Sequence, residues 1–437
     1  MEYQITIHEN ETNAEGLETL YQAAQREQAG SAFRTALLAA YESAPDNLLL
    51  AAWYYRLRET PEVEKSGRDT HWLVAIPVAV ITGLIFWWLS DFDFLVLEQV
   101  PVLALYGAPI AAIAMMAFLV IAGKRAVLPS LLIGLGLLAF PVYANLISPI
   151  QRVFLQESYL TMAIPHIALL AWIGVGMSVL GRRAGGQARF AFILKSFEVL
   201  VTGGLFAIAG GIFASISIGM FSALGIDIPE IILRLIFAGG AGALVVIVVA
   251  AVYDPALGPL AQSFGQGVSR LMPTLVRLLL PLTFVVLVIY VAFTPFNFRA
   301  PIENREVLIL NNGMLFAVIG LLMGATPLHE EDIPRQLRAW MRRGIMAVAS
   351  LAIIISLHAL TAILFRTYDA GILTMNRAIV IGWNIANLGI LITLLALQFK
   401  RGQAQWAAAL HKTFSLGSVV YLVWGLFVII AIPLLFR

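Results

Sequence analysis

Long apolar segments constrain this chain more than any other feature of its sequence. A helix needs about 20 mostly apolar residues to cross the hydrocarbon core of a bilayer. Only 12% of the 437 residues are charged, against about 25% in soluble domains, so a soluble fold would expose large apolar patches. We therefore expect an all-α, polytopic transmembrane helix bundle of about 11 spans. The windows are 72–89, 101–122, 127–147, 160–180, 197–223, 231–253, 272–293, 307–325, 345–365, 378–399 and 415–436.

The basic residues alternate between the segments that connect these windows. One set of alternate segments carries 18 of the 28 Lys and Arg, and the other carries six. The remaining four are Arg26, Arg34, Arg234 and Arg277. Short loops rich in Lys and Arg face the cytoplasm. The asymmetry predicts a cytoplasmic N-terminus, an external C-terminus and an odd number of spans in a bacterial-type cell (cytoplasmic or inner) membrane.

The residues before the first window form a separate region. We expect residues 1–70 to be a soluble, helical, cytoplasmic domain and residues 71–437 to be the transmembrane bundle. Three short helices are predicted in the first region, beginning at Thr12 or Asn13, at Ser31, and at Pro45 and Asp46. This domain has two alternative roles, a cap packed on the membrane domain or a docking module for a partner protein.

The sequence carries no motif of a known catalytic, nucleotide or metal site. It has no cysteine, which excludes disulfides, thiolate nucleophiles and Cys-ligated metals. P-loop, HExxH and GxSxG patterns are also absent. The formal net charge of +2 gives no reason to expect nucleic acid. We expect no catalytic residue, cofactor or metal, and an intramembrane enzyme is the least favoured class.

Five ionisable residues in or near the windows are candidates for function: Glu198, Arg234, Asp254, Arg270 and Arg277. Charged groups at the centre of a span cost about 2.5–3.5 kcal/mol on insertion scales. Arg270 and Arg277 share a helix face, and we expect Arg277 to pair with Glu198 or Asp254 near the cytoplasmic boundary. Arg234 follows Glu230 by four residues, a spacing that favours an ion pair. Structural pairing or snorkelling is the main interpretation, and a gate or proton relay is the alternative.

Neutral polar residues also lie inside the windows. His166 and His358 fall in the fourth and ninth windows. Asn384 and Asn387 fall in the tenth window, after Trp383. Polar side chains in membranes usually form hydrogen bonds between helices, because lipid offers no partners. We expect these four residues to hold helices together, with a proton or ligand role for the histidines as the alternative.

Small residues form a stripe in the fifth window, at intervals of four: Gly203, Ala207, Gly211, Ser215 and Gly219. The sixth window has two shorter pairs, Gly239 with Ala243 and Ala238 with Gly242. This spacing allows helix backbones to approach closely. We expect the fifth and sixth helices to pack tightly, and the alternative is a moving element.

Segment 332–343 is amphipathic. Ile333, Leu337, Trp340 and Met341 share one face, and Asp332 can cap the segment. Its basic residues are Arg335, Arg338, Arg342 and Arg343. The pattern predicts an interfacial helix that lies on anionic lipids of the inner leaflet.

A pattern near the C-terminal end resembles a known family. Arg366 is followed by Gly371, by Leu373 and Thr374, and by Arg377. This arrangement resembles the arginine–glycine–Leu-Thr–arginine pattern of the DUF4153 group of uncharacterised bacterial membrane proteins, with one inserted residue after the glycine. The resemblance implies a multi-pass bacterial membrane protein and transfers no catalytic residue.

Two functions fit these features. The first is a secondary transporter or permease-like protein with an unspecified small-molecule substrate. The second is a non-catalytic membrane scaffold or sensor whose residues 1–70 bind a partner protein. A water-accessible cavity at the midplane would favour the first, and a solidly packed bundle with an exposed apolar groove on residues 1–70 would favour the second.

Overall fold

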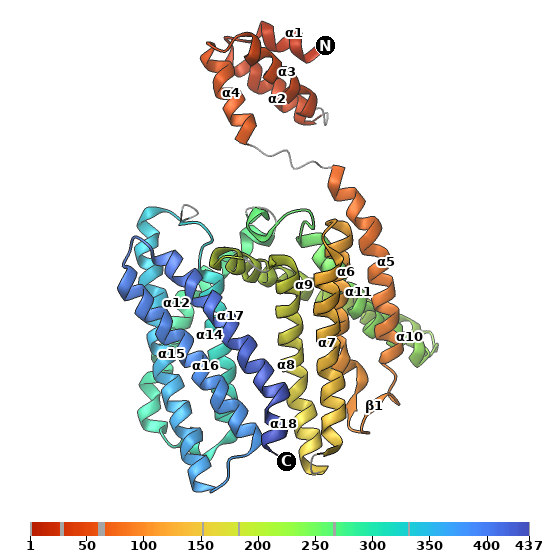
Figure 1. Ribbon diagram of the computed structural model, residues 1–437, viewed down its shortest axis with the longest axis vertical. Helices are drawn as coiled ribbons and strands as arrows, with labels where there is room; N and C mark the ends of the chain where they lie inside the picture. The colour runs from red at the N-terminus through yellow and green to blue at the C-terminus, as the bar shows by residue number, and fades with distance from the viewer. Residues whose placement is uncertain are drawn as a thin grey trace. The chain divides into compact units, whose positions relative to one another are not determined.

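The computed structural model describes residues 2–26, 30–59, 66–150, 153–181, 184–264, 268–330 and 333–436. Contacts divide the chain into two compact units, Met1–Asp69 and Thr70–Arg437, and both are drawn in Figure 1. The predicted cap Asp332 lies outside the described residues. The same is true of five basic loop residues: Lys65, Arg152, Arg182, Arg183 and Arg437.

The first unit contains four helices within the described residues: α1 (Glu2–Glu9), α2 (Ala14–Arg26), α3 (Gly30–Ser43) and α4 (Leu48–Glu59). The prediction of three helices missed α1, because its sequence is mostly polar. Ile7 of α1 is nevertheless fully buried in a core that includes Leu17, Phe33 and Trp53. Tyr3 also packs against this core, with its ring 6.1 Å from that of Phe33, so two side chains anchor a helix that is otherwise mostly polar.

The helix starts of this unit agree only partly with the expected caps. Asn13 accepts a hydrogen bond from the Gly16 N–H (3.0 Å) at the start of α2, as predicted. Helix α4 begins later than predicted, because Asn47 accepts bonds from the Leu49 and Leu50 N–H groups (2.9 and 3.2 Å). An asparagine carbonyl oxygen supplies the acceptor that the first helical N–H groups lack.

The second unit is almost entirely helical within the described residues. Its first half contains α5 (Ser66–Leu89), β1 (Leu95–Val96), β2 (Val100–Pro101), α6 (Val102–Ala122), α7 (Val127–Ile147), η1 (Ser148–Ile150), α8 (Val153–Leu180), α9 (Gly186–Ala223), α10 (Glu230–Arg234), the π-helix η2 (Leu235–Gly239) and α11 (Gly240–Val252). Its second half contains η3 (Pro259–Ala261), α12 (Val268–Phe293), η4 (Thr294–Asn297), α13 (Ala300–Glu303), α14 (Arg305–Ala325), α15 (Arg335–Asp369), α16 (Met375–Arg401), α17 (Trp406–Ile430) and α18 (Ile432–Leu435).

Among the described residues, 11 helices are long and apolar enough to cross a membrane. Each overlaps one of the expected windows, so the chain fits a multi-pass, all-α membrane protein. Helix α17 begins at Trp406 instead of 415, because Trp406, Leu410 and Phe414 pack into the core. Helix α9 is continuous and begins at Gly186, well before its window.

The predicted interfacial helix is not a separate element. Residues 335–343 form the first turns of α15, one helix of 35 residues. A helix of this length extends about 50 Å, whereas the hydrocarbon core is about 30 Å thick. The amphipathic pattern marks the part of α15 that exceeds the thickness of the hydrocarbon core. In this part Met341 is buried and Trp340 is 69% exposed.

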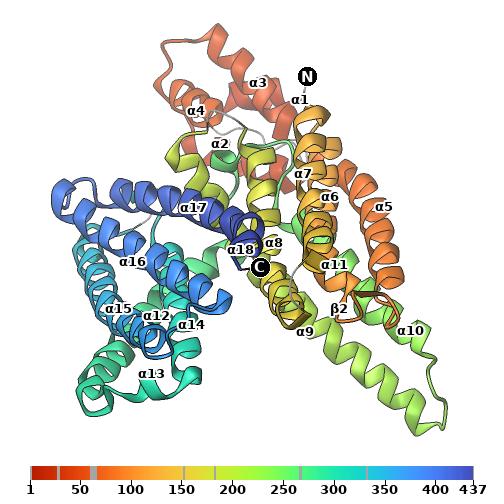
Figure 2. The same cartoon turned by 60° about the horizontal axis from the view of Figure 1, so that its bottom comes forward.

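Two groups of helices meet in the second unit. Helices α6, α7, α8 and α11 pack together, and so do α12, α14, α15 and α16 (Figure 1). Helix α17 contacts α16, α8 and α9, so it joins the two groups. The C-terminal half of α9 extends away from the other spans together with α10 (Figure 2).

The small residues of the sixth window lie against the first span. A Cβ added to Gly83 of α5 would lie 2.8 Å from the Gly239 carbonyl oxygen, and one added to Gly242 would lie 2.6 Å from the Phe86 ring. These small residues therefore allow η2 and α11 to approach α5 closely, which sequence spacing did not indicate.

The stripe on α9 leaves most of its length uncovered. Gly203 faces α11, where a side chain lies 3.7 Å from an added Cβ. No atom lies within 4 Å of a Cβ placed on Gly211 or Gly219, and Ala207 and Ser215 are exposed. The expected tight packing of the fifth and sixth helices is therefore seen only at Gly203.

Candidate functional site

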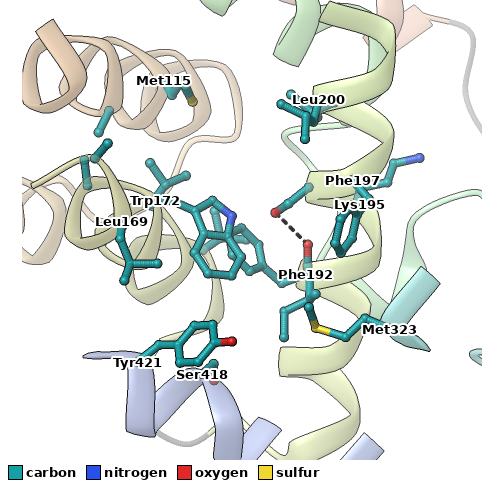
Figure 3. A pocket seen from close by; sticks show the side chains of 18 of the residues that line it. Met115, Leu169, Trp172, Phe192, Lys195, Phe197, Leu200, Met323, Ser418 and Tyr421 are labelled. Atoms are coloured by element: carbon teal, nitrogen blue, oxygen red, sulfur yellow. Dashed lines mark hydrogen bonds between the residues drawn. The ribbon is translucent and has the colours of Figure 1, made fainter. Parts of the chain in front are cut away.

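A cavity of about 520 Å³ lies where the two groups of helices meet. In Figure 3, Met115 of α6, Trp172 of α8, Phe197 of α9 and Tyr421 of α17 surround this space. Pockets that hold small molecules typically measure about 300–1,000 Å³. We call this space the central cavity.

Small side chains on three helices create the space. They are Ala108, Ala111 and Ala112 on α6, Ala168 and Ala171 on α8, and Gly417 on α17. Larger apolar side chains of α9 and α14 close the opposite wall, among them Phe197 and Met323. Since these residues come from both ends of the chain, the cavity exists only after the two helix groups have met.

Three hydroxyl groups of the wall are already engaged in hydrogen bonds within the protein. Ser196 donates to the Phe192 oxygen (2.8 Å), Ser418 to the Ser415 oxygen (2.8 Å) and Tyr421 to Asn387 Oδ1 (2.6 Å). The amino group of Lys195 points away from the cavity (Figure 3). The central cavity therefore offers a binding surface that is largely apolar.

A second cavity, of about 810 Å³, lies between α7, α8, the start of α9 and α17. Arg125 and Arg189 line it, and no Asp or Glu is among its lining residues. The Arg125 guanidinium donates to the carbonyl oxygens of Val179, Pro255 and Leu257 (2.8–3.2 Å). We call this space the arginine groove.

An aromatic pair separates the two cavities. Trp172 and Phe192 line both, and their rings stack with centroids 5.8 Å apart. A Cβ on Gly176 would lie 2.7 Å from the Phe192 ring, so the glycine allows Phe192 to pack against α8.

The buried charge of this region is an ion pair that the sequence interpretation did not identify. Lys195 Nζ lies 2.7 Å from Glu198 Oε2, and both side chains are more than nine-tenths buried. Lys195 also donates to the Ser263 carbonyl oxygen (2.8 Å). Glu198 therefore pairs with Lys195, one turn away on α9, and not with Arg277 as predicted. The window began at 197, which left Lys195 outside, although the i,i+3 spacing was a usable signal.

The other members of the expected cluster are dispersed. The Asp254 carboxylate accepts the Ala256 N–H (2.9 Å) within a loop, so it shapes the chain after α11. Arg277 is half-buried on α12. Arg270 is in the same helix, and its side chain lies outside the described part.

His166 is held in a fixed, neutral form. The indole N–H of Trp383 donates to His166 Nε2 (2.9 Å), and His166 Nδ1 lies 2.6 Å from the Met162 carbonyl oxygen. Because an indole is only a donor, Nε2 must accept and Nδ1 must carry the proton. This contact between α8 and α16 is the structural role expected for a membrane histidine.

The two asparagines of α16 also join helices. Asn384 donates to Asn312 Oδ1 of α14 (2.6 Å), and Asn387 accepts from Tyr421 of α17. Tyr421 lines the central cavity, so Asn387 orients a side chain of its wall. These contacts agree with the expected function of polar residues as links between spans.

His358 lies in the C-terminal third of α15. Its Nε2 is 3.1 Å from the carbonyl oxygen of Phe298, in the turn between η4 and α13, and its ring is 4.8 Å from the Phe298 ring. The residue therefore attaches a connecting turn to α15. It is not among the residues that line either cavity.

Arg234, the last residue of α10, binds residues at the C-terminal end of α5. It lies 4.0 Å from Glu230, as the spacing predicted, but its shorter contact is with Asp91 (2.8 Å). It also donates to the oxygens of Ser90 and Trp87. The hydrogen bond from Arg234 lowers the pKa of Asp91 below its ordinary value, so the carboxylate stays ionised at a lower pH than an unpaired aspartate.

The basic residues at the start of α15 have individual contacts. Arg342 donates to the side chain and the backbone oxygen of Gln398 on α16 (3.0 and 2.8 Å), and Arg338 donates to the Ile333 oxygen (2.9 Å). The Arg343 guanidinium lies 5.7 Å from the centroid of the Trp340 ring. The side chain of Arg335 is not described.

No group of three or more His, Cys, Asp or Glu residues that could hold a metal ion occurs in the described ranges. No protein-family model, curated protein or solved structure matches the chain. The resemblance to the DUF4153 group stays a prediction. The site therefore has to be interpreted from its own residues.

Proposed function

We propose that the chain is a permease-like membrane protein that binds an apolar or amphiphilic molecule in its central cavity. The observation that carries this proposal is the cavity itself, which is lined by helices from distant parts of the chain. A scaffold needs no such space, so the cavity favours a permease-like protein over a scaffold. Its apolar wall distinguishes the proposed ligand from the ions and sugars that need polar partners.

Proteins that move molecules across a bilayer commonly bind them where two helix groups meet, so that relative motion changes access. The central cavity lies at such a boundary, between the α6–α8 group and the α12–α16 group. The Trp172–Phe192 pair closes it from the arginine groove. An opening of this pair would connect the cavity with the groove.

Quenching of Trp172 fluorescence by an uncharged bromine-labelled ester, methyl dibromostearate, tests the proposal. The purified full chain is titrated in detergent, and the Trp172→Phe variant defines the share of the signal that belongs to Trp172. We expect saturable quenching of that share. Ala112→Phe fills the cavity and should abolish saturation, whereas Leu131→Phe adds a ring on the exposed face of α7 and should not.

Equal saturable quenching in the filled and control variants would overturn the proposal. Melting curves of all variants establish that each is folded, and Ala111→Leu provides a second filled variant. The native chain has no cysteine, so a bromine-free maleimide reporter at position 112 gives an independent measure of occupancy.

A further inference from the structure

The arginine groove is open toward the surroundings of the bundle along its apolar side. Leu128, Leu132 and Met177 line it and are 64%, 59% and 52% exposed. The helices α7 and α8 that carry them are membrane-crossing by length and composition. Whatever enters through this side comes from the bilayer.

One end of the groove is positively charged. Arg125 and Arg189 lie at the ends of adjacent helices, where α6 gives way to α7 and where α9 begins. The Arg125 guanidinium donates to neutral carbonyl oxygens, and no described carboxylate forms an ion pair with it. No described residue forms an ion pair with Arg189.

The remaining wall of the groove is mostly apolar. Pro129 and Ile133 of α7 and Leu422 of α17 continue from the arginines toward the Trp172–Phe192 pair. The polar pair Ser130 and Ser178 is bonded to itself (2.6 Å). A molecule that fits has a short anionic end and a long apolar body, which is the chemistry of an anionic membrane lipid.

We propose that the arginine groove binds one anionic lipid from the bilayer, with its phosphate on Arg189 and its acyl chains along α7 and α17. Arg125 supplies a fixed second positive charge, and Arg189 is the residue whose donors contact the phosphate oxygens. Planar guanidinium groups match phosphate geometry, and basic pockets between transmembrane helices bind lipid head groups. This inference rests on the proposed function, because it takes the groove as a space beside the proposed ligand cavity. Trp172 and Phe192 lie between the two spaces.

The test uses the full chain in phosphatidylcholine nanodiscs that contain small amounts of dibromo-phosphatidylglycerol or dibromo-phosphatidylcholine with identical chains. The measured quantity is the mole fraction of labelled lipid that quenches half of the Trp172 signal. We expect phosphatidylglycerol to act at roughly fivefold lower mole fraction, the effect of one head-group contact with a basic residue. Arg189→Gln should bring the ratio close to one, and Arg189→Lys should preserve part of it.

Arg343→Gln is the matched control. It removes one exposed arginine beside Trp340, outside the groove. Equal loss of preference in both variants would assign the effect to general surface charge and overturn the groove. Equal quenching by both lipids in the unmodified chain would overturn it as well.

Inorganic phosphate distinguishes a lipid head group from a free anion. Added at constant ionic strength, it should leave the phosphatidylglycerol quenching unchanged, and release of the quenching would overturn a lipid as occupant. If the lipid tests fail while methyl dibromostearate still quenches saturably, only the proposal of a lipid in the arginine groove is overturned. Loss of the ester quenching would overturn the proposed function.

Discussion

The two halves of α9 belong to one continuous helix but differ in what surrounds them. The N-terminal half buries Phe190, Lys195 and Glu198 and lines both cavities. The C-terminal half carries the glycine stripe, and most of its side chains are exposed. One 18-residue window of the helix is apolar enough for a membrane, whereas its N-terminal half also carries Arg189, Lys195 and Glu198. Hydropathy therefore marks where a helix can lie in lipid, whereas polar contacts and cavities mark where it meets the rest of the protein.

The largest expected effect comes from breaking the buried ion pair of the N-terminal half. Glu198→Ala leaves the Lys195 ammonium buried without its counter-ion, which costs about 3–5 kcal/mol of unfolding free energy. The combined Lys195→Met and Glu198→Leu variant removes both charges and should cost much less than either single change. Reversible unfolding in mixed detergent micelles measures both. A loss below about 1 kcal/mol for Glu198→Ala would mean that the charge reaches water.

One substitution made in both halves sharpens the comparison. Phe190 is fully buried with its ring 4.4 Å from that of His411, whereas Phe213 is 75% exposed. Phe190→Ala should cost about 3 kcal/mol, because a buried cavity remains. Phe213→Ala should stay within about 0.5 kcal/mol, as exposed substitutions do. Similar losses at the two positions, measured in the same micelles, would contradict the exposure of the C-terminal half.

Thr202 lies at the boundary of the two halves. It is 7% exposed, and its hydroxyl oxygen has no hydrogen-bond partner among the described residues. Thr202→Val removes this unsatisfied group at almost constant shape and should stabilise the fold by about 1 kcal/mol. Thr361→Val is the control, since its hydroxyl donates to the Leu357 oxygen (2.8 Å). Destabilisation by Thr202→Val would reveal a bonded hydroxyl.

The smallest effect is expected within the stripe. Gly211→Ala adds a methyl group where no atom lies within 4 Å, so improved helix propensity should stabilise the chain by less than about 1 kcal/mol. Gly176→Ala places the same methyl group 2.7 Å from the Phe192 ring and should destabilise it. Thermal unfolding compares the two variants directly. A loss at Gly211 would show that something does cover the stripe.

Much of the helical architecture could be predicted from the sequence, and much of the candidate site could not. The third window, 127–147, coincides with α7 (Val127–Ile147), because its ends are set by local composition. The contacts of His166 and Asn387 were expected in kind, but their partners Trp383 and Tyr421 were not. A polar residue in an apolar helix indicates that a hydrogen-bond partner is needed. The local sequence does not specify which helix supplies that partner.

The sequence by itself determined the class of protein, the expected set of eleven windows and the polar residues that need partners inside them. It could do so because each helix satisfies its own backbone hydrogen bonds, so the ability to cross lipid is a property of one segment. Only the tertiary structure decided that Lys195 pairs with Glu198, that the alanines of α6 and α8 enclose a cavity, and that the stripe on α9 is left uncovered. In lipid no hydrophobic force distinguishes a packed face from an exposed one, so these features depend on shape complementarity between segments far apart in the chain.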